Sequence, residues 1–152
     1  MRLLVDTNVI IDALIDRNEN HEDACCLLML GKVREFELWA SASQWTDMFY
    51  ILSEGGKRSR AHAVKRVMKG IRKAARVAPL MEGDIDDALA GTWDDFEDAC
   101  VHQAALSAKV DAIITENGRD FEKSSIPVYG CRALFDYLRD ERGLTYAVMD
   151  SN

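Results

Sequence analysis

The chain has 152 residues, a length that suits one domain with a substantial core. Apolar residues make up 48% of it and charged residues 30%, which excludes a disordered or fibrous protein. No apolar run approaches the roughly 20 residues that span a bilayer, and the N-terminus lacks a secretory leader pattern. We therefore expect a soluble, cytoplasmic protein with no membrane partner.

Five short apolar segments are predicted to be strands, with helix-period stretches between them. The predicted strands cover residues 2–5, 37–41, 76–79, 111–115 and 126–129. The predicted helices cover residues 9–15, 22–30, 44–53, 61–75, 85–90, 95–108 and 132–142. Strands that alternate with helices favour a parallel sheet covered on both faces. We expect an α/β fold, a three-layer α/β/α domain over residues 1–144, with residues 145–152 as a flexible tail or partner-binding arm.

The first predicted strand ends on a carboxylate. Asp6 follows the apolar run Leu3-Leu4-Val5 and is followed at once by Thr7, Asn8 and an apolar helical stretch. The carboxyl ends of parallel strands meet at one edge of the sheet, where open α/β folds bind ligands. Asp6 is therefore predicted to lie at a functional site, although an aspartate in this place is also a common helix N-cap.

Three further aspartates occupy similar settings. Asp47 lies on the helix after the second strand, Asp98 in the first turn of the 95–108 helix, and Asp120 just past the fourth strand. Clustered carboxylates hold Mg²⁺ or Mn²⁺ and leave positions for water and a phosphate. The four acids therefore favour a metal-dependent nuclease, while each also has a structural alternative: a solvated helix face for Asp47, the helix dipole for Asp98 and a loop cap for Asp120.

One segment carries the opposite charge. Residues 57–76 hold nine of the 19 basic residues and no acidic residue, whereas the other ten basic residues face all 26 acids. On the predicted 61–75 helix the basic residues lie mostly opposite the apolar positions. This pattern suits a solvated face or contact with RNA phosphates. The candidate RNA-binding residues are Lys65, Arg66, Lys69 and Lys73.

Four sequence blocks, taken in order, resemble the signature blocks of PIN domains. They are Asp6-Thr7-Asn8, residues 46–52 (TDMFYIL), residues 95–99 (DFEDA), and Thr115-Glu116-Asn117 with Asp120-Phe121. The likeness is strongest to the VapC-like toxins of toxin–antitoxin pairs, and it covers nearly the whole chain. A single block is a weak signal, whereas four in order form a specific one.

The resemblance implies a ribonuclease for single-stranded RNA that uses Mg²⁺ or Mn²⁺, forms a homodimer, and is inhibited by an antitoxin whose tail enters the active groove. Asp6, Asp98 and Asp120 match the family's metal-binding acids, and Asp47 stands where the family has a glutamate or aspartate. These four are the candidate catalytic residues, and the candidate supporting residues are Thr7, Asn8, Asp95, Thr115 and Asn117. Glu116 is a departure, because a basic residue is common at its position.

Other interpretations stay open at this point. A catalytically silent PIN scaffold or protein-binding module would keep the fold, although the retention of all four acids argues against it. An aspartate-nucleophile phosphatase would place a second aspartate two residues after the first, where this chain has Asn8. Metal-free cleavage by paired histidines is weakened because the three histidines follow no pattern, although His102 shares a helical face with Asp98.

Overall fold

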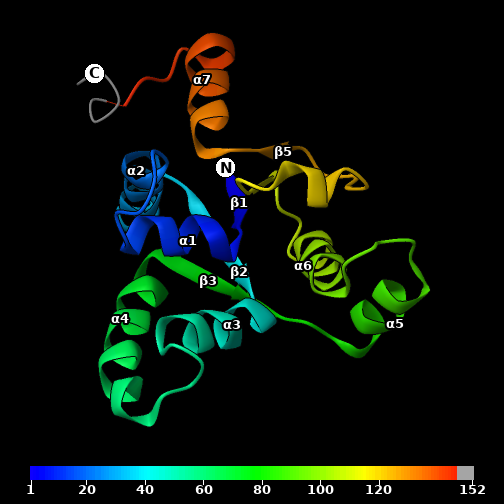
Figure 1. Ribbon diagram of the computed structural model, residues 1–152. Coiled ribbons are helices and arrows are strands. Elements are labelled where there is room, and N and C mark those ends of the chain that lie inside the picture. The colour runs from blue at the N-terminus through cyan, green and yellow to red at the C-terminus, as the bar shows by residue number, and fades with distance from the viewer. Residues whose placement is uncertain (147–152) are drawn as a thin grey trace.

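The computed structural model describes residues 1–146, and within them five parallel strands form one sheet (Figure 1). The strands are β1 (Arg2–Val5), β2 (Glu37–Ser41), β3 (Ala75–Ala78), β4 (Ala112–Ile114) and β5 (Val128–Tyr129). Their order is β3-β2-β1-β4-β5, and each neighbouring pair is parallel. The strand order therefore reverses at the central strand β1, which makes the carboxyl end of β1 the switch point where such sheets bind ligands.

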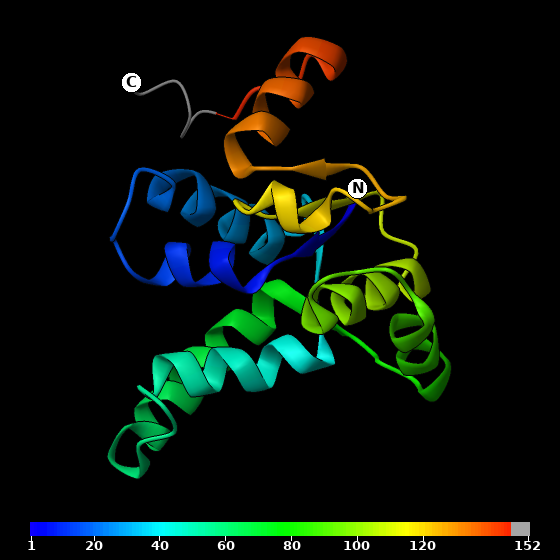
Figure 2. The same cartoon turned by 45° about the vertical axis from the view of Figure 1, so that its right-hand side comes forward.

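Helices cover both faces of the sheet, which confirms the predicted three-layer α/β/α fold. They are α1 (Thr7–Leu14), α2 (His21–Lys32), α3 (Ala42–Leu52), α4 (Ala61–Ala74), α5 (Glu82–Ala90), α6 (Phe96–Ser107) and α7 (Cys131–Arg142). Successive strand side chains point to opposite faces. Leu3 and Val5 join a core that includes residues of α1, α2, α4 and α7, whereas Leu4 packs in a second core with residues of α6. Figure 2 shows α6 on the other side of β1 from α1 and α2.

Several element boundaries differ from the predictions because side chains cap the elements. Helix α1 begins at Thr7, two residues early, because the Asp6 carboxylate accepts a hydrogen bond from the Thr7 N–H. Helix α5 begins at Glu82, three residues early, where Asp84 accepts a bond from the Met81 N–H. Strand β5 is shorter than predicted, because the backbone of Ile126 is engaged in a turn with the Ser124 hydroxyl.

Helices α3 and α4 project together from the sheet (Figure 2). The chain reverses between them at Gly55 and Gly56, which both have φ of +81°, a conformation that glycine adopts readily. A short 3-10 turn, η1 (Arg58–Arg60), leads into α4. The two glycines therefore allow α4 to fold back beside α3.

The described chain ends on a packed aromatic residue. The Tyr146 ring lies 5.8 Å from the Phe36 ring and 6.0 Å from the Phe135 ring, centroid to centroid. Of the tail predicted at residues 145–152, residues 147–152 lie outside the described residues. None of the helices within residues 1–146 is long and apolar enough to cross a membrane.

Candidate active site

An acidic pocket of about 440 Å³ lies at the carboxyl ends of β1 and β4. Among residues 1–146, six carboxylate side chains line it: Asp6, Asp47, Asp95, Glu97, Asp98 and Asp120. Thr7, Asn8, Asn117 and Arg17 also line the pocket. The fold thus brings the four candidate catalytic residues together from four separate segments of the chain, and the candidate supporting residues Thr7, Asn8, Asp95 and Asn117 lie beside them.

Asp6 is fixed by donors that converge on its carboxylate. Oδ1 accepts bonds from the Thr7 N–H at 2.6 Å and from Gln44 Nε2 at 3.3 Å. Oδ2 accepts bonds from the Thr115 hydroxyl at 2.8 Å and from Asn8 Nδ2 at 2.9 Å. Burial raises the pKa of Asp6, and these hydrogen bonds oppose that rise. Asp6 is therefore the N-cap of α1, and these hydrogen bonds hold its carboxylate in one orientation at the pocket.

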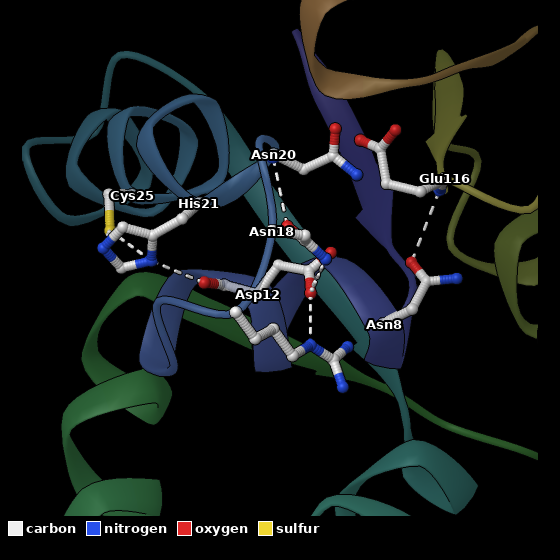
Figure 3. A network of polar contacts seen from close by, with 8 residues as sticks. Asn8, Asp12, Asn18, Asn20, His21, Cys25 and Glu116 are labelled. Atoms are coloured by element: carbon white, nitrogen blue, oxygen red, sulfur yellow. Dashed lines mark hydrogen bonds and ion pairs between the residues drawn. The ribbon is translucent and has the colours of Figure 1, made fainter.

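The residues after β4 hold this arrangement from the other side. Thr115 is buried beneath the pocket, and its hydroxyl oxygen accepts bonds from Asn8 Nδ2 at 3.2 Å and from the Asn117 N–H at 3.0 Å. The Glu116 N–H donates to Asn8 Oδ1 at 3.4 Å, as Figure 3 shows. The side chains of Asn8 and Thr115 therefore orient Asp6.

Glu116 does not place its charge in the acidic pocket. Its Oε1 accepts a bond from the Cys131 N–H at 2.9 Å, at the first residue of α7. A carboxylate in this place pairs with a backbone N–H that has no partner within the helix, and it is stabilised by the positive end of the helix dipole. The departure from the family pattern thus has a structural role at α7.

Gln44 was not among the predicted site residues, although it is fully buried and touches Asp6. Its Oε1 accepts a bond from the Ser41 N–H at 2.7 Å, and the Gln44 N–H bonds back to the Ser41 hydroxyl. This reciprocal pair is a capping box at the start of α3. The Ser-x-x-Gln spacing of Ser41 and Gln44 is the sequence signal that could have identified this capping box.

The first turn of α6 supplies three acids to the pocket. Asp95 is the N-cap, and its Oδ1 accepts bonds from the Glu97 N–H at 2.7 Å and the Asp98 N–H at 3.2 Å. Partial burial, followed by the charges of Asp95, Asp6 and Asp120, raises the pKa of Asp98 to about 7. The pocket therefore concentrates negative charge that its own residues leave largely uncompensated.

Glu97 is a second residue that the sequence analysis missed. Partial burial and the neighbouring Asp47, which shares a hydrogen bond with it, raise its pKa to about 6. Two carboxyl groups can share a hydrogen bond only when one holds a proton. The sequence placed Glu97 beside Asp98 but gave no sign that it faces Asp47 on α3.

His102 lies outside the pocket lining. It is 5% exposed, its ring stacks on Trp93 at 4.9 Å between centroids, and its Nε2 accepts a bond from the Ser125 N–H. Burial lowers its pKa. His102 is therefore a core residue and does not reach the acidic pocket.

The candidate RNA-binding residues lie on α4 and do not line the acidic pocket. Lys65 and Lys69 border a groove of about 620 Å³ between α3 and α4, together with Trp45, Phe49 and Met68. Arg66 and Lys73 are exposed on the same helix. Their contact with RNA remains a prediction.

The donor chemistry of the pocket fits a hard divalent cation. Its lining offers carboxylate, amide and hydroxyl oxygens and no histidine or cysteine, the set that Mg²⁺ and Mn²⁺ prefer. Partial burial first, and then the neighbouring carboxylates, raise the pKa of Asp98, and a bound cation would offset the negative charge that gathers here. Within residues 1–146, no three His, Cys, Asp or Glu side chains are close enough to form a ready coordination site. The ligand set Asp6, Asp98 and Asp120 therefore remains a prediction.

The chain matches a known protein family over most of its length. A family model described as "PIN domain" matches residues 2–119. The curated protein "Ribonuclease VapC1" of Aquifex aeolicus (strain VF5) is 27% identical over 135 residues, which cover 84% of this chain and 88% of that protein.

Solved structures share the fold. FitAcB from Neisseria gonorrhoeae aligns with a TM-score of 0.65 at 17% identity, covering 86% of this chain and 98% of that one. VapBC2 from Rickettsia felis, bound to a DNA fragment from its promoter, aligns with a TM-score of 0.62 at 11% identity over 86% and 98% of the two chains. A toxin–antitoxin complex from Klebsiella pneumoniae aligns with a TM-score of 0.56 at 18% identity over 85% and 97%.

Proposed function

The chain belongs to the PIN-domain family, and we propose that it is a metal-dependent endoribonuclease that cleaves single-stranded RNA. The observation that supports this most is the meeting of carboxylates from four chain segments in one pocket at the sheet's switch point. If each acid had only a structural role of its own, such as capping a helix, the acids would not need to meet in one pocket. The curated relative is named as a ribonuclease, which favours RNA cleavage over the other reactions that this site could catalyse.

In this proposal Asp6, Asp98 and Asp120 hold Mg²⁺ or Mn²⁺, and Asp47 completes the catalytic set. When bound, the cation polarises the phosphodiester and lowers the pKa of the attacking water. Thr115 and Asn8 keep the Asp6 carboxylate oriented, and Gln44 holds it from α3. Preorganised ligands of this kind need no rearrangement during the reaction.

The pair Asp47 and Glu97 adds a site for a proton beside the proposed ligands. Partial burial and the neighbouring Asp47 raise the pKa of Glu97 toward the neutral range, where acid–base catalysis is efficient. Its shared hydrogen bond with Asp47 keeps the two side chains together. We assign the pair to accepting or delivering a proton at the edge of the pocket.

The test is cleavage of end-labelled RNA by the purified chain. We expect cuts within a single-stranded oligoribonucleotide in Mg²⁺ or Mn²⁺, no cuts in excess chelator, and far slower cleavage of the same sequence in a duplex. Cleavage that persists in chelator would contradict the metal requirement. Equal rates on both forms of RNA would contradict the strand preference.

We further propose that the protein is the toxin of a toxin–antitoxin pair. One of its structural relatives is described as a toxin–antitoxin complex, which supports a protein partner. Expression of the chain alone should slow the growth of its host, and the Asp98→Asn variant, expressed to the same level, should not. Normal growth with a folded and expressed wild-type chain would favour the silent scaffold.

The proposed assembly is a homodimer. The aromatic residues of α3 support it in part, because Trp45 and Phe49 line the apolar groove beside α4 instead of being fully buried. Tyr50, by contrast, lines the acidic pocket. Light scattering at micromolar concentration should give the mass of two chains. A single-chain mass would contradict the dimer.

A further inference from the structure

Of the residues that line the acidic pocket within residues 1–146, one is basic. Arg17 lies in the segment between α1 and α2 and lines the pocket. The six carboxylates repel an RNA strand, so one guanidinium among them changes the local potential. The mechanism above leaves Arg17 without a role.

A buried carboxylate holds Arg17 in place. Asp12 of α1 is 2% exposed, and its Oδ1 accepts bonds from Arg17 Nε at 2.7 Å and from Asn18 Nδ2 at 2.9 Å. The carbonyl oxygen of Asp12 also accepts a bond from His21 Nδ1 at 2.7 Å. Figure 3 shows Asn18 and His21 arranged around Asp12. The segment that carries Arg17 is therefore fixed at several points.

The pairing leaves most of the guanidinium free. Only Nε bonds to Asp12, and within residues 1–146 neither terminal nitrogen has a hydrogen-bond partner. The Arg17 side chain is 46% exposed, compared with 3% for Asp12. Two parallel N–H groups of a guanidinium match two oxygens of a phosphate.

A second pair of the same kind provides a contrast. Arg132 Nε lies 2.8 Å from Oδ2 of the buried Asp23, and the Arg132 side chain is 56% exposed. Arg132 does not line the acidic pocket. Both pairs thus join an arginine Nε to a buried aspartate, and of the two arginines Arg17 lines the acidic pocket.

We propose that Arg17 binds a phosphate of the RNA strand beside the scissile phosphodiester, and that Asp12 is the residue that positions it. This inference rests on the proposed function. The pair Arg17–Asp12 is neutral overall, but Arg17 still supplies oriented N–H donors and one local positive charge to the phosphate. Because Arg17 and the proposed ligands Asp6 and Asp98 line one pocket, a strand that reaches the metal passes the guanidinium.

The test measures the dissociation constant of a short 5′-fluorescein-labelled oligouridine by fluorescence anisotropy over a range of salt. Ca²⁺ replaces Mg²⁺, and a gel confirms that the RNA stays intact. Arg17→Gln should bind about five- to twentyfold more weakly, and its salt slope should fall by about 0.7, the value for one lost phosphate contact on a single strand. The matched control Arg132→Gln should leave affinity and slope unchanged.

Further variants separate recognition from folding and from charge. Because Arg17→Gln leaves the buried Asp12 without its cation and can destabilise the fold, the double variant Asp12→Asn/Arg17→Gln removes both charges together. It should still bind weakly, because the donors are lost while the net charge is unchanged. Asp12→Asn alone should weaken binding about threefold and keep the salt slope, since the charge of Arg17 remains. Arg17→Lys should restore most of the slope.

Two results would overturn the proposal. If the wild-type chain binds RNA but the double variant binds it equally well, Arg17 has only a structural role and the proposed ribonuclease function stands. If the folded wild-type chain binds no single-stranded RNA at any salt concentration, the phosphate site and the proposed function fall together.

Discussion

Replacing Asp98 with asparagine should stabilise the metal-free fold, although it removes a proposed ligand. Partial burial and four nearby carboxylates raise the pKa of Asp98 from 3.8 to about 7. The pKa of Asp98 is higher in the folded protein than in the unfolded chain, so the folded state holds the proton more tightly. The stability that this contributes is fully present below the unfolded pKa and is lost as the pH rises through about 7. Asparagine does not ionise, so it avoids this loss.

The size of the effect follows from the shift. About three pH units correspond to about 4 kcal/mol without screening. Because Asp98 is half-buried, water and salt reduce this to about 1–2 kcal/mol above pH 7. For a domain of this size the melting temperature should rise by about 3–6 °C. The advantage should shrink as the pH falls toward the unfolded pKa.

The assay is thermal unfolding followed by circular dichroism in chelator, across mildly acidic to mildly alkaline pH. Glu82→Gln is the control, because Glu82 is an exposed acid in the first turn of α5 and tests the helix-dipole contribution alone. Saturating Mg²⁺ should reverse the order of wild type and Asp98→Asn. A variant that is less stable than wild type in alkaline chelator, or a difference that does not change with pH, would refute this reasoning.

Mg²⁺ at about a hundredfold excess over its dissociation constant should stabilise the fold by about 2.7 kcal/mol, and chelator should reverse this effect. A melting temperature that changes in neither Mg²⁺ nor Mn²⁺ would contradict the metal site. Gly31→Ala should destabilise by about 1–3 kcal/mol in urea titration, because the added Cβ would lie 2.3 Å from Leu38 Cδ1. Gly70→Ala, with nothing within 4 Å, should stabilise α4 by about 0.5–1 kcal/mol, and equal shifts at the two sites would refute the packing argument. Gln44→Ala should destabilise the fold by about 1–2 kcal/mol, because the capping box is lost. Gln44→Glu should destabilise it more, because it places a second carboxylate against Asp6. Wild-type stability of either variant would count against this contact.

The sequence predicted the fold class and the position of Asp6 because both depend on local patterns. An apolar run that ends on Asp6 and turns into a helix places that residue at the strand edge, whichever helices pack nearby. Asp120 was placed by the same logic, since it follows β4, the neighbour of β1. The parallel register then brings these strand ends together.

Residues that reach the site from the helices were harder to predict. Glu97 meets Asp47 because of the way α6 packs against α3, and no periodicity in either segment determines that packing. The sequence did not single out Arg17, because its place at the pocket depends on a hydrogen bond to Asp12, whose burial is a property of the tertiary structure. For α4, the charge pattern showed which helix face is exposed but not toward which edge of the sheet that face lies.

The most direct measurement is the single-turnover rate of RNA cleavage in Mg²⁺ by wild type, Asp98→Asn and the control Asp94→Asn. Asp94 comes from the same segment but is exposed and does not line the acidic pocket. We expect Asp98→Asn to lose at least about a hundredfold in rate while staying folded, and Asp94→Asn to stay within about twofold of wild type. Cleavage by Asp98→Asn at the wild-type rate would contradict the claim that this pocket performs the chemistry.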